Sequence, residues 1–149
     1  MMSAKDIAQE AVETLRDNIR TAMADKGKNA TGETARTLDV IARSVGAEGG
    51  EAALEANGNW RWVGNGRGPG AMPPIAPIQA WIRARGLDLN AWAVAGKIKR
   101  EGSRDFRLKR PNIFIEEIRG WEENELPRVD AKLTDLLADR VVRTINAIL

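Results

Sequence analysis

The sequence of 149 residues contains no cysteine and no histidine. The lack of cysteine excludes disulfides, thiolate zinc sites and cysteine nucleophiles. The lack of histidine excludes the catalytic triads and metal sites that need an imidazole. A chain of this length can bury enough surface to fold without such crosslinks. We therefore predict a single domain over residues 1–149 with no metal and no cofactor.

Long apolar segments are also missing. Residues 1–6 lack the basic stretch and apolar run of a signal peptide. The longest uncharged stretch, residues 68–82, contains four prolines and is unsuited to a membrane helix. We therefore expect neither secretion nor membrane insertion.

The net charge is only +2, but it is distributed unevenly. Residues 1–60 carry a net charge of −3, residues 61–110 carry +8, and residues 111–149 carry −3. A basic middle between acidic ends indicates nucleic-acid contact, or contact between the middle of one subunit and the ends of another. An ordinary solvated surface with a chance cluster of cations is the alternative.

Hydrophobic spacing predicts a small sheet between helices. Residues 3–25 form an amphipathic helical pattern, with Ser3 and Asp6 as a capping pair. Residues 36–46 fit a strand or a helix, and we favour a strand. Residues 36–63 then make a β-meander with a first turn at Gly46, Gly49 and Gly50 and a second turn at Asn57-Gly58. The segment after the second turn forms a third strand or a single helical turn.

The second half of the sequence is predicted to be mainly helical. A glycine- and proline-rich loop covers residues 64–74, and a helical hairpin covers 75–102. A basic connector (103–112) leads to a C-terminal helical region (113–149), in which Pro127 indicates a break or a kink. The fold class is therefore α+β: a small antiparallel sheet packed by long N- and C-terminal helices, with a helical hairpin after the loop.

The loop at residues 64–74 does not have the pattern of a phosphate-binding loop. It lacks the Lys-Ser/Thr pair of a P-loop and the Gly-x-Gly-x-x-Gly spacing of a dinucleotide site. Glycines allow close backbone approach, whereas prolines stiffen the chain. We interpret the loop as an assembly element in which Arg67 can bind a carboxylate, and a rigid connector is the alternative.

Tryptophans cluster around this loop. Trp60 and Trp62 share strand parity, so we expect both on one face of the sheet. Core packing is the default for both, and an interface anchor is the alternative for one of them. Trp81 and Trp92 lie on predicted apolar faces and are expected in the core. The candidate contacts with another subunit or partner are Trp60, Trp62, Arg67, Pro69, Met72, Pro73 and Pro74.

A second candidate surface is the basic segment at residues 97–110. It can contact DNA or an acidic partner, and we favour a solvated or subunit-facing surface over direct contact with DNA. The candidate residues are Lys97, Lys99, Arg100, Arg104, Arg107, Lys109 and Arg110. A nucleic-acid-binding protein that uses this segment is the alternative function.

Candidate catalytic groups are few. The carboxylate pairs Glu116-Glu117 and Glu122-Glu123 are adjacent on a predicted helix, so the members of each pair point to different faces. Neither pair fits an acid–base dyad, and no nucleophile motif is present. We therefore predict a non-enzymatic protein with no catalytic residue.

An ordered set of short motifs resembles a known family. The motifs are Ala30-Thr31-Gly32, Thr37-Leu38-Asp39-Val40, Trp60-Arg61-Trp62, Gly66-Arg67-Gly68-Pro69-Gly70 with Met72-Pro73-Pro74, Ile78-x-x-Trp81-Ile82 and Arg85-Gly86-Leu87. The set resembles the tail-completion or neck proteins of long-tailed bacteriophages, over residues 30–102. The segment from Ala95 to Gly102 is similar to the helix that follows in that family.

The resemblance implies a structural virion protein, made in the host cytoplasm and located at the head–tail interface. Copies would form a ring that joins the connector to the tail tube or the tail terminator. The resemblance implies no catalytic residue. The DNA that passes through the ring is a further possible contact for the basic segment.

Overall fold

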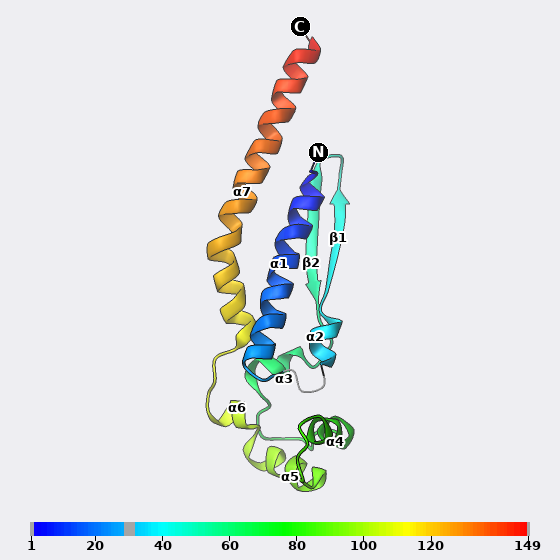
Figure 1. Cartoon of the computed structure of the whole chain (residues 1–149), viewed down its shortest axis with the longest axis vertical. Helices are drawn as coiled ribbons and strands as arrows, with labels where there is room; N and C mark the ends of the chain where they lie inside the picture. Colours follow the sequence, from blue (N-terminus) through cyan, green and yellow to red (C-terminus); the bar gives the residue numbers. More distant parts are fainter. Residues whose placement is uncertain (1, 29–31, 149) are drawn as a thin grey trace. The chain divides into compact units, whose positions relative to one another are not determined.

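The computed structural model describes residues 2–28 and 32–148 and has the predicted α+β architecture (Figure 1). The strands β1 (Asp39–Val45) and β2 (Gly49–Glu55) pair in an antiparallel hairpin. The helices are α1 (Ala4–Asp25), α2 (Glu33–Thr37), α3 (Trp60–Asn65), α4 (Ile75–Ala84), α5 (Ala91–Glu101), α6 (Arg104–Arg107) and α7 (Ile113–Ile148).

The residues group into two compact units. The first unit contains Met1–Asn18, Leu38–Glu55 and Glu117–Leu149, and the second contains Ile19–Thr37 and Ala56–Glu116. Helices α1 and α7 therefore contribute residues to both units. The single domain expected from the length stays a prediction, and each unit is described by itself.

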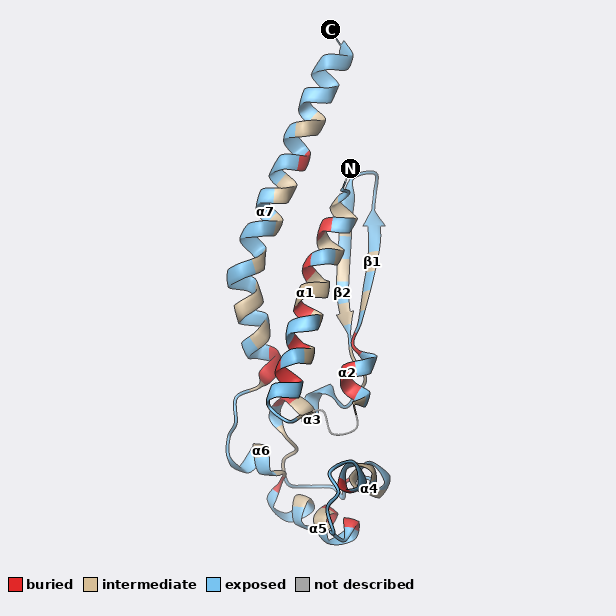
Figure 2. Cartoon of the chain, in the orientation of Figure 1, coloured by how far each residue is buried: buried red, intermediate tan, exposed pale blue. Residues whose placement is uncertain are grey.

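In the first unit, α1 lies beside the β-hairpin and buries Ile7, Ala11 and Leu15 (Figure 2). A Cβ atom at Gly50 in β2 would lie 2.2 Å from the backbone nitrogen of Lys5, so only glycine permits this close approach. The predicted cap at the start of α1 is confirmed: the Ser3 amide donates to the Asp6 carboxylate at 2.8 Å.

The hairpin differs from the predicted meander. The strand preference for residues 36–46 is confirmed for Asp39–Val45, and so is the glycine turn predicted after it, which lies around Gly46; the second predicted turn, at Asn57-Gly58, does not form a hairpin. The side chain of Asn57 instead accepts the amide of Asn59 at 3.2 Å, just before α3. The prediction of a third strand is therefore wrong. The structure has instead the helical alternative, as the short helix α3.

Helix α7 covers the predicted C-terminal helical region without interruption. It runs through Pro127, so the predicted break is wrong, although Pro127 has no amide hydrogen to donate to the carbonyl one turn earlier. Within the first unit, the indole nitrogen of Trp121 donates to the Ala11 carbonyl at 2.6 Å, and Arg140 pairs with Glu48 at 2.9 Å. These contacts hold α7 against α1 and the hairpin.

In the second unit, α4 and α5 form the predicted helical hairpin. The side chain of Asn90 caps α5 by accepting the amides of Trp92 and Ala93. The hairpin buries Ile82 and the small side chains of Ala91 and Ala95. The prediction of a core position for Trp92 is wrong, because α5 packs through its alanines and leaves Trp92 63% exposed. Trp81 is 38% exposed and so is not a core residue either.

Candidate functional site

Helix α3 and the loop that follows it form the best-defined polar site, which lies within the second unit. The expectation that Trp60 and Trp62 share a sheet face is wrong, because both lie on α3 and residues two apart point to different faces of a helix. Trp60 packs edge-on against Phe114, with ring centroids 5.7 Å apart. Trp62 is half exposed and lies beneath the guanidinium of Arg67, whose Cζ is 5.1 Å from the ring centroid.

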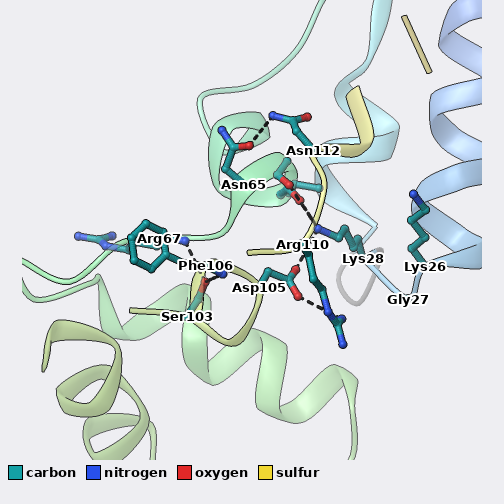
Figure 3. A network of polar contacts seen from close by, with 12 residues as sticks. Lys26, Gly27, Lys28, Asn65, Arg67, Ser103, Asp105, Phe106, Arg110 and Asn112 are labelled. Atoms are coloured by element: carbon teal, nitrogen blue, oxygen red, sulfur yellow. Dashed lines mark hydrogen bonds and ion pairs between the residues drawn. The ribbon is translucent and has the colours of Figure 1, made fainter. Parts of the chain in front are cut away.

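Hydrogen bonds hold the loop to the last turn of α5 and to Ser103, which precedes α6 (Figure 3). The Arg67 amide donates to the Ser103 hydroxyl at 2.9 Å, and the Ser103 amide donates to the Arg67 carbonyl at 2.7 Å. The Gly70 amide donates to the Lys99 carbonyl at 2.9 Å. The loop therefore has a defined conformation within the chain.

Glycine is required where the loop meets α6. Gly66 has a φ of +74°, and a Cβ atom there would lie 2.5 Å from the Ser103 hydroxyl oxygen and 2.6 Å from the Phe106 amide nitrogen. At Gly68, a Cβ atom would press against the Phe106 ring at 3.2 Å. Gly66 and Gly68 thus allow the loop to lie close to Ser103 and to Phe106 of α6.

The Arg67 side chain makes contacts inside the loop. It donates to the Ala71 carbonyl at 3.3 Å and stacks on Trp62. Among the described residues it has no carboxylate partner within 4 Å, so its predicted role in binding a carboxylate from another molecule stays a prediction. Stacking limits the freedom of the guanidinium, and Arg67 as a whole is only partly exposed.

The other predicted contact residues of the loop differ in exposure. Pro73 is buried, so its contacts are within the chain. Pro69, Met72 and Pro74 are exposed, and Pro74 immediately precedes α4. The accessible part of this candidate surface therefore consists of Trp60, Trp62, Arg67, Pro69, Met72 and Pro74.

All seven candidate residues of the basic segment are exposed. Arg107 pairs with Glu101 at 3.3 Å, and Arg110 pairs with Asp105 at 3.2 Å. Within the described part of the chain, the other five basic side chains have no carboxylate within 4 Å. These five are Lys97, Lys99, Arg100, Arg104 and Lys109. The segment thus presents charge that its own acidic residues do not neutralise.

Lys28 makes long-range contacts that the sequence did not indicate. Its side chain is only 10% exposed, and its ammonium donates to the Val63 carbonyl at 2.8 Å and pairs with Asp105 at 2.9 Å (Figure 3). It therefore links the end of α3 to α6. Because its partners lie more than 30 residues away in the sequence, no local pattern could have identified it.

Asn112 provides a second long-range link. Its side-chain amide donates to Asn65 at 2.7 Å, and its side-chain oxygen accepts the Phe114 amide at 2.9 Å, which caps α7. A Cβ atom at Gly64 would lie 2.8 Å from the side-chain nitrogen of Asn112, so a larger residue there would displace this side chain. The capping function of Asn112 can be read from its position before an apolar run, but the link to Asn65 cannot.

A cavity of about 300 Å³ lies next to these links, lined by Lys26, Lys28, Arg110, Pro111 and Ile113. Its cations are already paired: Lys26 with Glu116, and both Lys28 and Arg110 with Asp105. The arrangement is therefore an internal ion-pair network rather than a site with free charge for an anion. In the part of the chain that the structure describes, no three acidic side chains group closely enough to hold a metal ion.

Neither the helices nor any similarity to known proteins indicates a function for the described part of the chain. No described helix combines the length and apolar character needed to cross a bilayer. Neither a protein-family model, nor a curated protein, nor a solved structure matches the chain significantly. The function must therefore be argued from the surfaces themselves.

Proposed function

We propose that this chain is a structural virion protein of a tailed bacteriophage, which forms a ring at the head–tail junction and joins the connector to the tail. The observation that carries the proposal is the separation of charge between the two units. The first unit has 8 basic and 15 acidic side chains, a net charge of −7. The second has 15 basic and 6 acidic side chains, a net charge of +9.

Opposite charge on two units of one chain favours head-to-tail association of identical copies. The acidic unit of one copy attracts the basic unit of the next, and such a contact uses two different surfaces. Contacts of this heterologous type generate a closed ring when the rotation between neighbours closes. Identical units of two copies repel each other, which disfavours a symmetric dimer through like surfaces.

The loop at residues 64–74 supports the phage assignment. Its motifs are those that resemble neck and tail-completion proteins, and its backbone is held in place by Ser103 and Lys99. A segment that is already ordered loses less conformational entropy when it contacts a partner. The loop is therefore suited to a connector or tail protein as its partner.

The direct test is to locate the protein in virions of the phage that encodes it. Gold-labelled antibody against the chain should bind disrupted particles at the head–tail junction. An antibody against the major capsid protein serves as the control and should label heads. Absence of the chain from purified virions, by immunoblot and mass spectrometry, would refute the assignment.

Nucleic-acid binding is the second candidate, and the five basic side chains without carboxylate partners favour it. In this case the chain would bind duplex DNA through phosphate contacts, with an affinity that falls steeply as salt rises. Fluorescence anisotropy with a labelled duplex, measured from 50 to 200 mM salt, separates the two functions. A ring subunit without DNA binding should show little anisotropy change at 150 mM salt.

A further inference from the structure

Two half-exposed aromatic rings flank the loop at residues 64–74. Trp62 of α3 is 49% exposed, and Phe106 of α6 is 44% exposed. The Arg67 guanidinium lies over the Trp62 ring, with its Cζ atom 5.1 Å from the ring centroid. The next residue, Gly68, lies against the Phe106 ring, because a Cβ atom there would be 3.2 Å from it. Two consecutive loop residues therefore connect rings that are far apart in the sequence.

The Phe106 ring is held in place on the side that faces the chain (Figure 3). A Cβ atom at Gly102 would lie 2.8 Å from the ring, and the Phe106 amide donates to the Ser103 hydroxyl at 3.5 Å. Ser103 also accepts the amide of Arg67 at 2.9 Å, so one hydroxyl positions both sides of the surface. A ring that is already fixed loses little conformational entropy when a ligand stacks on it.

The surface around the two rings carries mainly positive charge. Residues 60–74 contain Arg61 and Arg67 and no acidic residue. Residues 97–110 contain seven basic and two acidic residues, and both acidic side chains form ion pairs within the chain. Five of the seven basic side chains have no carboxylate within 4 Å among the described residues. These five cations are therefore available for the phosphates of a nucleic acid.

Exposed aromatic rings beside unpaired cations are the features that bind single-stranded nucleic acid. The bases of a single strand are unpaired, so they can stack on aromatic rings while cations contact the backbone. In a duplex the bases are stacked and paired inside the helix, so a duplex would use the cations and leave the rings unused. The carboxylates of an acidic protein segment would likewise pair with the cations alone. The rings therefore favour a single strand over both of these partners.

We infer that Trp62, Phe106 and the basic segment at residues 97–110 form a binding site for single-stranded nucleic acid. One base stacks on Phe106, and another stacks on the pair of Trp62 and Arg67, since a guanidinium plane also accepts a stacked base. The backbone phosphates contact the five cations without carboxylate partners, among them Arg104. The inference refines the nucleic-acid candidate and does not depend on ring formation.

Three labelled oligomers of about 16 nucleotides test the site. Oligothymidine, an abasic strand of the same length and a duplex are compared by fluorescence anisotropy with the full chain, in about 50 mM salt. Oligothymidine should bind at least about fivefold more tightly than either of the others, which corresponds to one stacked base. Equal affinity for oligothymidine and the abasic strand would overturn the inference, and so would a preference for the duplex.

The contribution of stacking is tested at Trp62. Trp62→Ala should weaken binding to oligothymidine at least about fivefold and leave binding to the abasic strand unchanged. Trp62→Phe should restore most of the affinity, because phenylalanine also stacks. The matched control is Trp81→Ala, which removes a tryptophan of 38% exposure from α4 and should bind like the wild type. A folded Trp62→Ala protein, as judged by circular dichroism, that keeps the wild-type affinity for oligothymidine would contradict the stacking.

The contribution of charge is tested at Arg104. Arg104→Gln should reduce the slope of log affinity against log salt concentration by about 0.7, the value for one phosphate of a single strand. Arg119→Gln, which removes an exposed cation of α7, should leave the slope unchanged. A slope that Arg104→Gln does not alter would contradict the phosphate contact. A chain that binds none of the three oligomers at low salt would refute both this site and the nucleic-acid candidate, but not the ring, which is tested separately in virions.

Discussion

Replacement of Ser103 by alanine should weaken the attachment of the loop to α6. The Ser103 hydroxyl accepts the Arg67 amide at 2.9 Å and the Phe106 amide at 3.5 Å, and the latter contact caps α6. Loss of an N-cap serine costs about 1 kcal/mol. The half-buried Arg67 amide also loses its acceptor, which adds about 1 kcal/mol to this cost. We therefore expect the free energy of unfolding to fall by about 2 kcal/mol.

Urea unfolding followed by tryptophan fluorescence is the appropriate assay, because four of the five tryptophans lie in the second unit. The control is Ser44→Ala, at an exposed position of β1 in the other unit. Hydrogen exchange should also accelerate at the Arg67 amide in Ser103→Ala. If Ser103→Ala and Ser44→Ala have the same unfolding midpoint, and exchange at Arg67 is unchanged, the loop is not held by Ser103.

Three further predictions concern backbone conformation, a buried cation and pH. Gly66→Ala should lower the free energy of unfolding by at least about 1 kcal/mol, because its positive φ and its close contacts exclude a Cβ atom, whereas Gly58→Ala, with open space around it, should not. Lys28→Met should cost about 2 kcal/mol in urea unfolding, because it leaves two carbonyls and a carboxylate without their shared donor, and a cost below 0.5 kcal/mol would contradict this role. The hydrogen bond from the Ser3 amide lowers the pKa of Asp6. The resulting stabilisation is present above the unfolded pKa of about 3.9 and is lost as pH falls through the lower folded value. Circular dichroism at pH 2–5 should therefore show a smaller acid-induced loss of helix in Asp6→Asn, and an identical loss would contradict the cap.

Much of the fold could be predicted because its signals are local. The apolar spacing of α1 and α7, the cap at Ser3 and the glycine after α5 all act within a few residues, and each appears in the structure. The predicted hairpin turn at Asn57-Gly58 is wrong because an asparagine side chain can also accept a backbone amide just before a helix, as Asn57 does before α3. The Asn-Gly pair alone therefore does not distinguish a hairpin turn from the start of a helix.

The candidate site was predictable only in part. The sequence indicates that residues 64–74 form a stiff loop, but its attachment depends on Lys99 and Ser103, which lie about 30 residues away in the sequence. The exposure of Trp92 could not be predicted because α5 offers two possible faces, and the helix packs through the small alanine face. Which face of a helix packs depends on the space beside the neighbouring element. The periodicity of the sequence carries no information about that space.

The mass of the purified chain in solution tests the central claim most directly. Native mass spectrometry at about physiological ionic strength, over a range of protein concentrations, should show one closed oligomer at a fixed multiple of 16.3 kDa. Raising the salt concentration should shift this oligomer toward monomer, because the attraction between the acidic and basic units is screened. A monomer at every concentration and at low salt would contradict the claim that this chain assembles into a ring.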